Sequence, residues 1–162
     1  MQSDDALIDL LDENGNVIEQ RVRSKIDKKV AILRSVNILL LNEKNELFVV
    51  EAKEKQPFDV QWGNSAAGLV RHGETREEAA KRTVARELGL KLDLVFLKEE
   101  FYNFNGVKRF MSTFYARTDQ VPKINAEDIK KADWLSGEEI EKRKAQSMPT
   151  FLASLNIVAS QL

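Results

Sequence analysis

The chain contains no cysteine, and this absence excludes disulfide bonds, thiolate zinc sites and cysteine nucleophiles together. A single histidine, His72, excludes a metal site built from several imidazoles. No apolar run approaches the roughly 20 residues that a membrane-spanning helix needs. The acidic start, MQSDDALIDLLDENG, lacks the basic and then apolar layout of a signal peptide. We therefore expect a cytoplasmic protein with no membrane partner, whose chemistry rests on carboxylates, arginine, lysine and hydroxyls.

An excess of either charge is also missing. The 25 basic residues nearly balance the 26 acidic ones, and the isoelectric point lies near 6.0. Without an overall positive field, we expect no nucleic-acid polymer as a partner. The length of 162 residues suits one hydrophobic core, so we expect a single domain over residues 1–162.

Short apolar runs between turn residues predict most of the strands. The pairs Asn14-Gly15 and Asn105-Gly106 predict hairpins, because both residue types tolerate the positive φ of a tight turn. Residues 1–30 are expected to hold an N-terminal hairpin and a connector, and residues 36–41 and 47–50 a second hairpin of buried strands. Residues 54–64 are predicted to form a loop. Further strands are expected at residues 65–70, 94–104 and 107–117.

The clearest helix is expected over residues 75–88. Thr75 and Glu78 have the spacing of a capping box, in which each side chain pairs with an amide at the helix start. Gly89 stands where a helix ends. The buried stripe is predicted to contain Ala80, Val84 and Leu88. A terminal helix is expected over 148–162. This order of elements predicts an α+β fold or a three-layer α/β/α arrangement with a mixed sheet.

Residues 68–90 read GLVRHGETREEAAKRTVARELGL and resemble the signature of the Nudix superfamily. That signature is Gly, five residues, Glu, seven residues, Arg-Glu, an aliphatic residue, any residue, Glu-Glu, any residue, Gly and an aliphatic residue. Seven of its nine specified positions match, namely Gly68, Glu74, Arg82, Val84, Glu87, Gly89 and Leu90. The resemblance implies an α/β/α sandwich with a mixed sheet. The order of the remaining segments resembles the branch that contains isopentenyl-diphosphate isomerase.

Two positions depart from this signature. The family's three glutamates correspond to positions 83, 86 and 87, where this chain has Thr83, Arg86 and Glu87. In the family these glutamates hold a divalent metal, so the resemblance implies Mg²⁺ or Mn²⁺, bound weakly here and with help from substrate phosphates. We expect the side chains at positions 83 and 86 to be exposed.

Other acidic and basic residues are candidates with a plain structural alternative. The resemblance suggests Asp128, and after it Glu127, as a base near the metal, although an acidic solvent loop is equally consistent. Arg71, His72 and Arg86 are candidates for phosphate binding, and the alternative for Arg71 and His72 is that both are merely solvated at the tip of the loop. Arg82 is expected to form ion pairs with Glu74 and Glu78 that brace the loop. Trp62, Phe58 and Tyr102 are candidates for stacking on a flat group or for ordinary packing.

Two functions follow from the resemblance. The first is metal-assisted hydrolysis of a diphosphate linked to another group, with Glu87, Asp128 and Glu127 as the catalytic candidates and activity weakened or altered. The alternative is a binding or regulatory protein that holds a small phosphorylated molecule without turnover, with Arg86 in the place of metal charge. Isomerisation of isopentenyl diphosphate is rejected, because Ala67 and Leu69 occupy the stretch where that enzyme needs other groups, and the chain has no cysteine. The oligomeric state stays open, with a homodimer as one option.

Overall fold

A computed structural model describes residues 5–52, 62–127 and 129–161 of the chain. Its N-terminal part begins with strands β1 (Leu7–Leu11) and β2 (Val17–Val22), followed by a 3₁₀ turn at Arg23–Lys25. The predicted hairpin is present, since Gly15 has a φ of 84° between strands that pair antiparallel. The connector that was predicted to follow this hairpin contains the 3₁₀ turn at Arg23–Lys25. β1 meets the rest of the sheet where Leu11 pairs with Ile32.

The central part contains strands β3 (Ile32–Leu41), β4 (Leu47–Ala52), β5 (Trp62–Gly63) and β6 (Ala66–Leu69), and then helix α1 (Arg76–Leu88). Most of the predicted loop at 54–64 lies outside the described residues, but its end at residues 62–63 is a strand. Thr75 and Glu78 form the predicted capping box, and Gly89 ends α1 with a φ of 64°. These local signals therefore located the helix to within one residue at its start.

The C-terminal part contains strands β7 (Val95–Phe104), β8 (Val107–Arg117) and β9 (Ile129–Leu135), helix α2 (Gly137–Lys142), a 3₁₀ turn (Lys144–Gln146) and helix α3 (Pro149–Gln161). The β7–β8 hairpin and the terminal helix agree with the predictions. α2 was not predicted. No helix among the described residues is both long enough and apolar enough to span a membrane.

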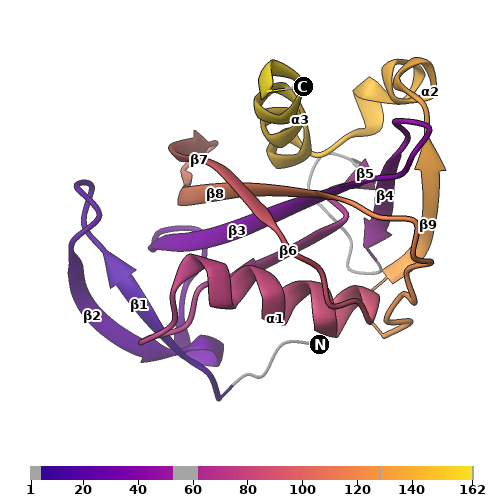
Figure 1. Cartoon of the computed structure of the whole chain (residues 1–162). Coiled ribbons are helices and arrows are strands. Elements are labelled where there is room, and N and C mark those ends of the chain that lie inside the picture. The colour runs from indigo at the N-terminus through magenta and orange to yellow at the C-terminus, as the bar shows by residue number, and fades with distance from the viewer. Residues whose placement is uncertain (1–4, 53–61, 128, 162) are drawn as a thin grey trace.

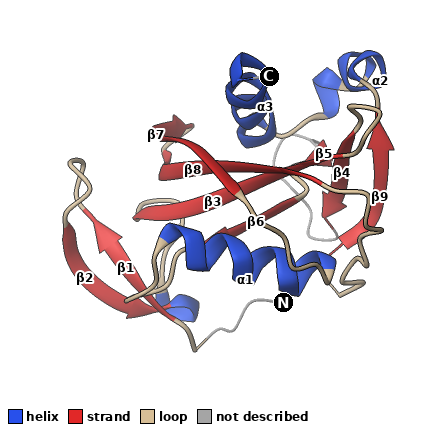
Figure 2. Cartoon of the chain, in the orientation of Figure 1, coloured by secondary structure: helices blue, strands red, loops and turns tan. Residues whose placement is uncertain are grey.

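The strands form one mixed sheet with a helix layer on each face (Figure 1). β3 lies at its centre, parallel to β8 on one side and antiparallel to β6 on the other. Figure 2 shows α1 along one face and α3 across the other. The fold is the predicted α/β/α sandwich with a mixed sheet.

The predicted hairpin of β3 and β4 is confirmed, but its antiparallel pairing is short. A tight turn joins the two strands, but only Leu41 and Leu47 pair, and β4 then runs beside β5 and β9. The Ser65 hydroxyl sits where the strands separate. It accepts the Leu40 N–H and donates to the Phe48 carbonyl, so it replaces the missing rungs of the ladder.

Two apolar cores lie on opposite faces of β3. Val36, Ile38 and Leu40 pack with α1 in one core, where Ala80, Val84 and Leu88 are buried as predicted. Leu39 and Leu41 pack in the other core, with residues of α3. Because side chains alternate along a strand, the two faces of the sheet can be assigned residue by residue.

Candidate functional site

The loop from Gly68 to Gly73 is fastened to α1 by the predicted ion pair of Glu74 and Arg82. The Arg82 Nε lies 2.8 Å from Glu74 Oε2, and its Nη2 donates to Glu74 Oε1 at 3.0 Å and to the Leu69 carbonyl at 2.8 Å. The Arg71 N–H donates to the same carboxylate at 3.0 Å. Glu78 was expected to join this group. Its carboxylate instead accepts the Thr75 N–H and closes the capping box.

Opposing effects act on the pKa of Glu74. Burial of the side chain raises the pKa, but hydrogen bonds from Arg82 and from the Arg71 N–H, with the positive charge of both arginines, hold it below its ordinary value of 4.5. The carboxylate is therefore charged at neutral pH, and it braces the loop in that state.

Thr83 does not occupy an exposed position, and this expectation was wrong. The side chain is 1% exposed, and its hydroxyl donates to the Ala79 carbonyl at 2.7 Å. The reason is that α1 packs against both β6 and β3, so its buried face is wider than the predicted stripe. That face contains Ala79, Ala80, Thr83, Val84 and Leu88.

Glu87 is half-buried at the end of α1 and reaches the edge of β6. Its Oε1 accepts the Ala67 N–H at 3.2 Å. Arg86 stands beside it, half-buried and with a buried Nε atom. A carboxylate and a permanent cation therefore sit together where the family signature has two glutamates.

The acidic loop after β8 is tied to the same end of α1. The Lys123 N–H donates to the Leu88 carbonyl at 2.8 Å, and the Asn125 N–H donates to the Glu87 carbonyl at 3.0 Å. Glu127 is exposed, and its N–H donates to the Asn125 side chain. Asp128 lies outside the described residues. The backbone thus brings this loop close to Glu87, while the catalytic roles of Glu127 and Asp128 stay predictions.

His72 is engaged elsewhere. Its Nδ1 lies 2.8 Å from the Asp9 carboxylate, and its N–H donates to the Leu7 carbonyl, so the loop tip contacts β1. Arg71 forms an isolated bridge with Ile8 of the same strand. Phosphate binding by Arg71 stays a prediction.

The described residues do not form a ready-made metal centre. Over residues 5–52, 62–127 and 129–161, no group of three or more His, Cys, Asp or Glu side chains could hold a metal ion. Thr83 directs its hydroxyl to a carbonyl and Arg86 is a cation, so Glu87 is the one carboxylate at the three signature positions. Among the described residues, these donors alone do not complete the coordination of a divalent ion.

Two of the three predicted stacking residues lie in the described part of the chain, and both contact other side chains of the protein. Trp62 is buried in the α3-side core, with the Arg143 guanidinium 4.7 Å from its ring centre. Tyr102 stacks on Phe104 at 6.4 Å between centroids, and burial raises the pKa of its hydroxyl. Phe58 lies outside the described residues. Trp62 is therefore a packing residue.

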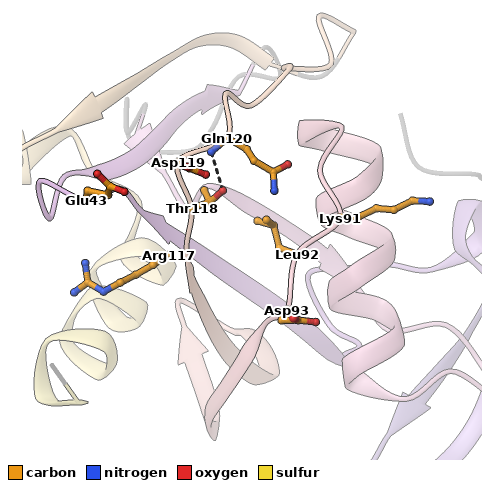
Figure 3. Close-up of a pocket in the computed structure, with 8 residues that line it drawn as sticks. All are labelled: Glu43, Lys91, Leu92, Asp93, Arg117, Thr118, Asp119 and Gln120. Carbon is orange, nitrogen blue, oxygen red and sulfur yellow. Dashed lines mark hydrogen bonds between the residues drawn. The ribbon is translucent and has the colours of Figure 1, made fainter.

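Sequence reasoning missed a polar cleft of about 460 Å³ beyond the end of β8 (Figure 3). It lies between the segment after α1 and the segment after β8, with the Gln120 N–H donating to the Thr118 hydroxyl. Its charges are mixed and come from Glu43, Lys91, Asp93, Arg117 and Asp119. The positions are far apart in the sequence, so no local motif signalled them.

Two buried polar side chains on the central strands were also missed. Asn37 of β3 is 4% exposed and Thr113 of β8 is fully buried. Part of the signal was present, because Asn37 stands between apolar residues of β3 and Thr113 stands in a buried stretch of β8. Their meeting depends on the parallel pairing of β3 with β8, which no local pattern predicts.

Similar proteins define the class to which this fold and site belong. A Nudix hydrolase of Deinococcus radiodurans is 30% identical over 145 residues, which cover 87% of this chain and 85% of the relative. A crystal structure of a protein from the same organism superposes with a TM-score of 0.76 and 24% identity, covering 93% of this chain and 98% of that one. An isopentenyl-diphosphate isomerase of Pectobacterium atrosepticum is 23% identical and covers 94% of this chain and 89% of its own length.

The Nudix domain of Shewanella oneidensis NrtR, solved with ADP ribose, shares the fold at a TM-score of 0.66 and 15% identity, covering 85% of this chain and 94% of that one. The NUDIX domain family matches residues 31–155 of this chain. The chain belongs to the Nudix family, as its signature predicted.

Proposed function

We propose that this chain hydrolyses a small molecule in which a diphosphate is linked to another group, and that the substrate arrives as its Mg²⁺ or Mn²⁺ complex. The observation that supports this proposal is the half-buried Glu87 carboxylate, which is held at the edge of β6 by the Ala67 N–H. Mg²⁺ needs few protein ligands when substrate phosphates supply oxygens, so a chain whose described residues form no metal centre can still accept such a complex.

The residues of the chain have separate roles in this reaction. Glu87 accepts the proton of the attacking water while the water oxygen bonds to phosphorus and the bond to the bridging oxygen breaks. Glu127 and Asp128 are further candidates for this base, because the Asn125 N–H ties their loop to the Glu87 carbonyl. Arg71 and Arg86 contribute positive charge for the phosphates. Turnover is slow, because two of the family's carboxylates are missing.

A second function is favoured by Arg86 itself. A permanent cation beside Glu87 attracts phosphate without a metal and repels a metal ion. In this alternative the chain binds a phosphorylated small molecule and does not turn it over, and the ADP-ribose complex of the NrtR Nudix domain illustrates a Nudix fold with such a ligand.

The two functions are separated by assaying binding and turnover together. The purified chain is incubated with Mg²⁺ or Mn²⁺ and a panel of nucleotide sugars, dinucleotides and nucleoside triphosphates, and phosphate release is followed beside calorimetric binding. Glu87→Gln should lower the rate by about 10²-fold or more, as expected on loss of a general base. Glu77→Gln, an exposed change in the first turn of the same helix, is the matched control and should keep the wild-type rate. Binding without turnover would reject hydrolysis and leave the second function.

A further inference from the structure

Strand β2 forms an edge of the sheet. It stands at one end of the strand order, and β1 is the strand that pairs with it among the described residues. Figure 1 shows β2 on the outer side of the N-terminal hairpin. Five of its six residues, 17–21, are exposed. An exposed strand edge presents unpaired N–H and C=O groups to which another strand can bind.

The hydrogen bonds of the hairpin show which residues of β2 direct their backbone outwards. The Arg23 N–H donates to the Ala6 carbonyl at 2.8 Å, so this pair is hydrogen-bonded. Hydrogen-bonded and non-hydrogen-bonded pairs alternate along an antiparallel ladder. Arg21 therefore directs its N–H and C=O to β1, whereas Gln20 and Val22 direct theirs to the free edge.

Glu19 and Arg21 lie side by side on one face of β2. The Arg21 Nε lies 2.9 Å from Glu19 Oε1, and both side chains are about half exposed. Because a two-fold axis between two antiparallel strands exchanges positions on either side of it, such a pair is complementary to a second copy of itself.

One antiparallel register of β2 with a second copy satisfies both the backbone and the charges. In this register Gln20 lies on the two-fold axis, and its outward N–H and C=O bond to those of Gln20 in the second copy. Glu19 then faces Arg21 of the second copy at a non-hydrogen-bonded pair, where side chains are closer. An axis at Glu19 or at Arg21 would place like charges opposite each other, which is destabilising. An axis at Ile18 or Val22 would leave both ion pairs unmade.

Apolar side chains extend this contact at both of its ends. Ile18 faces Val22 of the second copy, and Ile18 is 66% exposed in the single chain. Val30, which is 73% exposed, lines a cavity of about 440 Å³ beside the hairpin together with Ile18. The other apolar residues of this cavity are Leu10, Leu11, Ala31 and Ile32. Pairing of β2 removes part of this apolar surface from water and so adds to the backbone hydrogen bonds.

Strand β7 is another edge of the sheet, and its charges suit a second copy less well. Among the described residues it pairs with β8, and its Lys98 ammonium lies 2.7 Å from Glu100. A two-fold register that pairs Lys98 with Glu100 of a second copy places Glu99 opposite Glu99. Like charges directly opposite each other weaken a strand pair. The complementary edge is therefore β2.

We propose that two copies of this chain associate through antiparallel pairing of their β2 strands, around a two-fold axis at Gln20. The contact is smaller than a standard protein interface, so the dimer is weak and exchanges readily with the monomer. Its ion pairs are exposed to solvent, so salt weakens it further. The inference does not depend on the proposed reaction.

The test exchanges the two charges. Glu19→Arg and Arg21→Glu each place like charges opposite each other in a homodimer. The double variant Glu19→Arg/Arg21→Glu restores opposite charges, and so does a mixture of the two single variants. Lys98→Glu is the matched control, because it reverses an exposed charge on the edge strand β7. Sedimentation equilibrium measures the mass of the 18.5 kDa chain from about 1 µM to about 1 mM, where weak dimers dissociate.

We expect the wild type to pass from monomer to dimer over this range. Each single variant should raise the dimer dissociation constant by about tenfold or more, because two cross-strand pairs change from attraction to repulsion. The double variant and the mixture should recover the wild-type affinity, and Lys98→Glu should keep it. Gln20→Pro should abolish the dimer and still fold, because the N–H that it removes faces the free edge. Melting temperatures verify the folding of each variant.

A wild type that keeps a mass of 18.5 kDa at every concentration would overturn the inference, and the charges of β2 would then serve to keep chains apart. A dimer that survives Gln20→Pro and both single variants would place the contact elsewhere and would overturn it as well. Single variants that dissociate but do not recover when mixed would exclude the two-fold register at Gln20.

Discussion

Replacing Thr83 by glutamate restores one signature carboxylate, and the structure predicts a large cost. Position 83 is 1% exposed and faces the apolar core. A carboxyl group there avoids carrying an unpaired charge by staying protonated. For a glutamate of ordinary pKa near 4.3, keeping the proton at pH 7 costs about 3.7 kcal/mol, at about 1.36 kcal/mol per pH unit. In a chain of this size, that loss lowers the melting temperature by about 7–15 °C.

The pH dependence identifies the cause of this loss. Because burial raises the folded-state pKa of the new carboxyl above its unfolded value, the destabilisation grows as the pH rises above 4.3. The free energies of unfolding of Thr83→Glu and the wild type are measured by urea titration. The difference between them should shrink by about 1.4 kcal/mol for each unit that the pH falls from 7 towards 5. Thr83→Gln is the control, since it has the same size and no charge, and its cost should not vary with pH.

The double change Thr83→Glu and Arg86→Glu then tests whether the site has lost only its ligands. Divalent metal should stabilise the double variant, because binding to the folded form alone raises the free energy of unfolding. A loss below about 1 kcal/mol for Thr83→Glu, with no pH dependence, would refute the reasoning from burial. A double variant that gains neither metal-dependent stability nor hydrolysis would favour the binding function.

Three further predictions concern the loop, the end of α1 and metal affinity. Glu74→Gln should lower the free energy of unfolding at pH 7 by about 1.5–3 kcal/mol, since it breaks the charged hydrogen bonds to Arg82. The folded-state pKa of Glu74 is depressed, so this contribution is complete above pH 4.5 and is lost as the pH falls through the folded value, and melts of variant and wild type should converge in acid. Gly89→Ala should cost about 1 kcal/mol, because alanine disfavours a φ of +64° and its Cβ would lie 3.4 Å from Lys123 Cβ, whereas Gly89→Asn should cost less in the same urea titration. Calorimetry without substrate should give a Mg²⁺ dissociation constant in the millimolar range, and tight binding to the free chain would contradict the missing-ligand argument.

Local signals allowed part of this fold to be predicted from the sequence. The capping box of Thr75 and Glu78 and the C-terminal Gly89 located α1, because helix ends are decided by a few neighbouring residues. Ser136 and Glu139 repeat the same capping box at the start of α2, so that short helix was also within reach. Hairpins with Asn-Gly turns were predicted for the same reason.

Long-range pairing was not predictable in this way. β3 and β4 adjoin in the chain, yet they separate after one pair because β6 and β8 occupy both sides of β3. The signature spacing predicted the pairing of Glu74 with Arg82, since eight residues bring the loop back onto the helix. The burial of Thr83 and the meeting of Asn37 with Thr113 depend on which strands pack beside each other. A single sequence does not show which strands pair.

The parallel pairing of β3 with β8 also governs the order in which the chain can fold. Ile32 pairs with Lys108 and Leu41 with Arg117, so the central ladder joins two strands between which β4 to β7 and α1 lie in the sequence. Forming a ladder between strands so distant in sequence costs the entropy of closing a long loop before any contact forms. Proteins with many such pairings fold slowly. During synthesis, β3 presents an apolar, unpaired edge until residue 117 has left the ribosome. A growing chain of this protein is therefore most prone to aggregation in that interval.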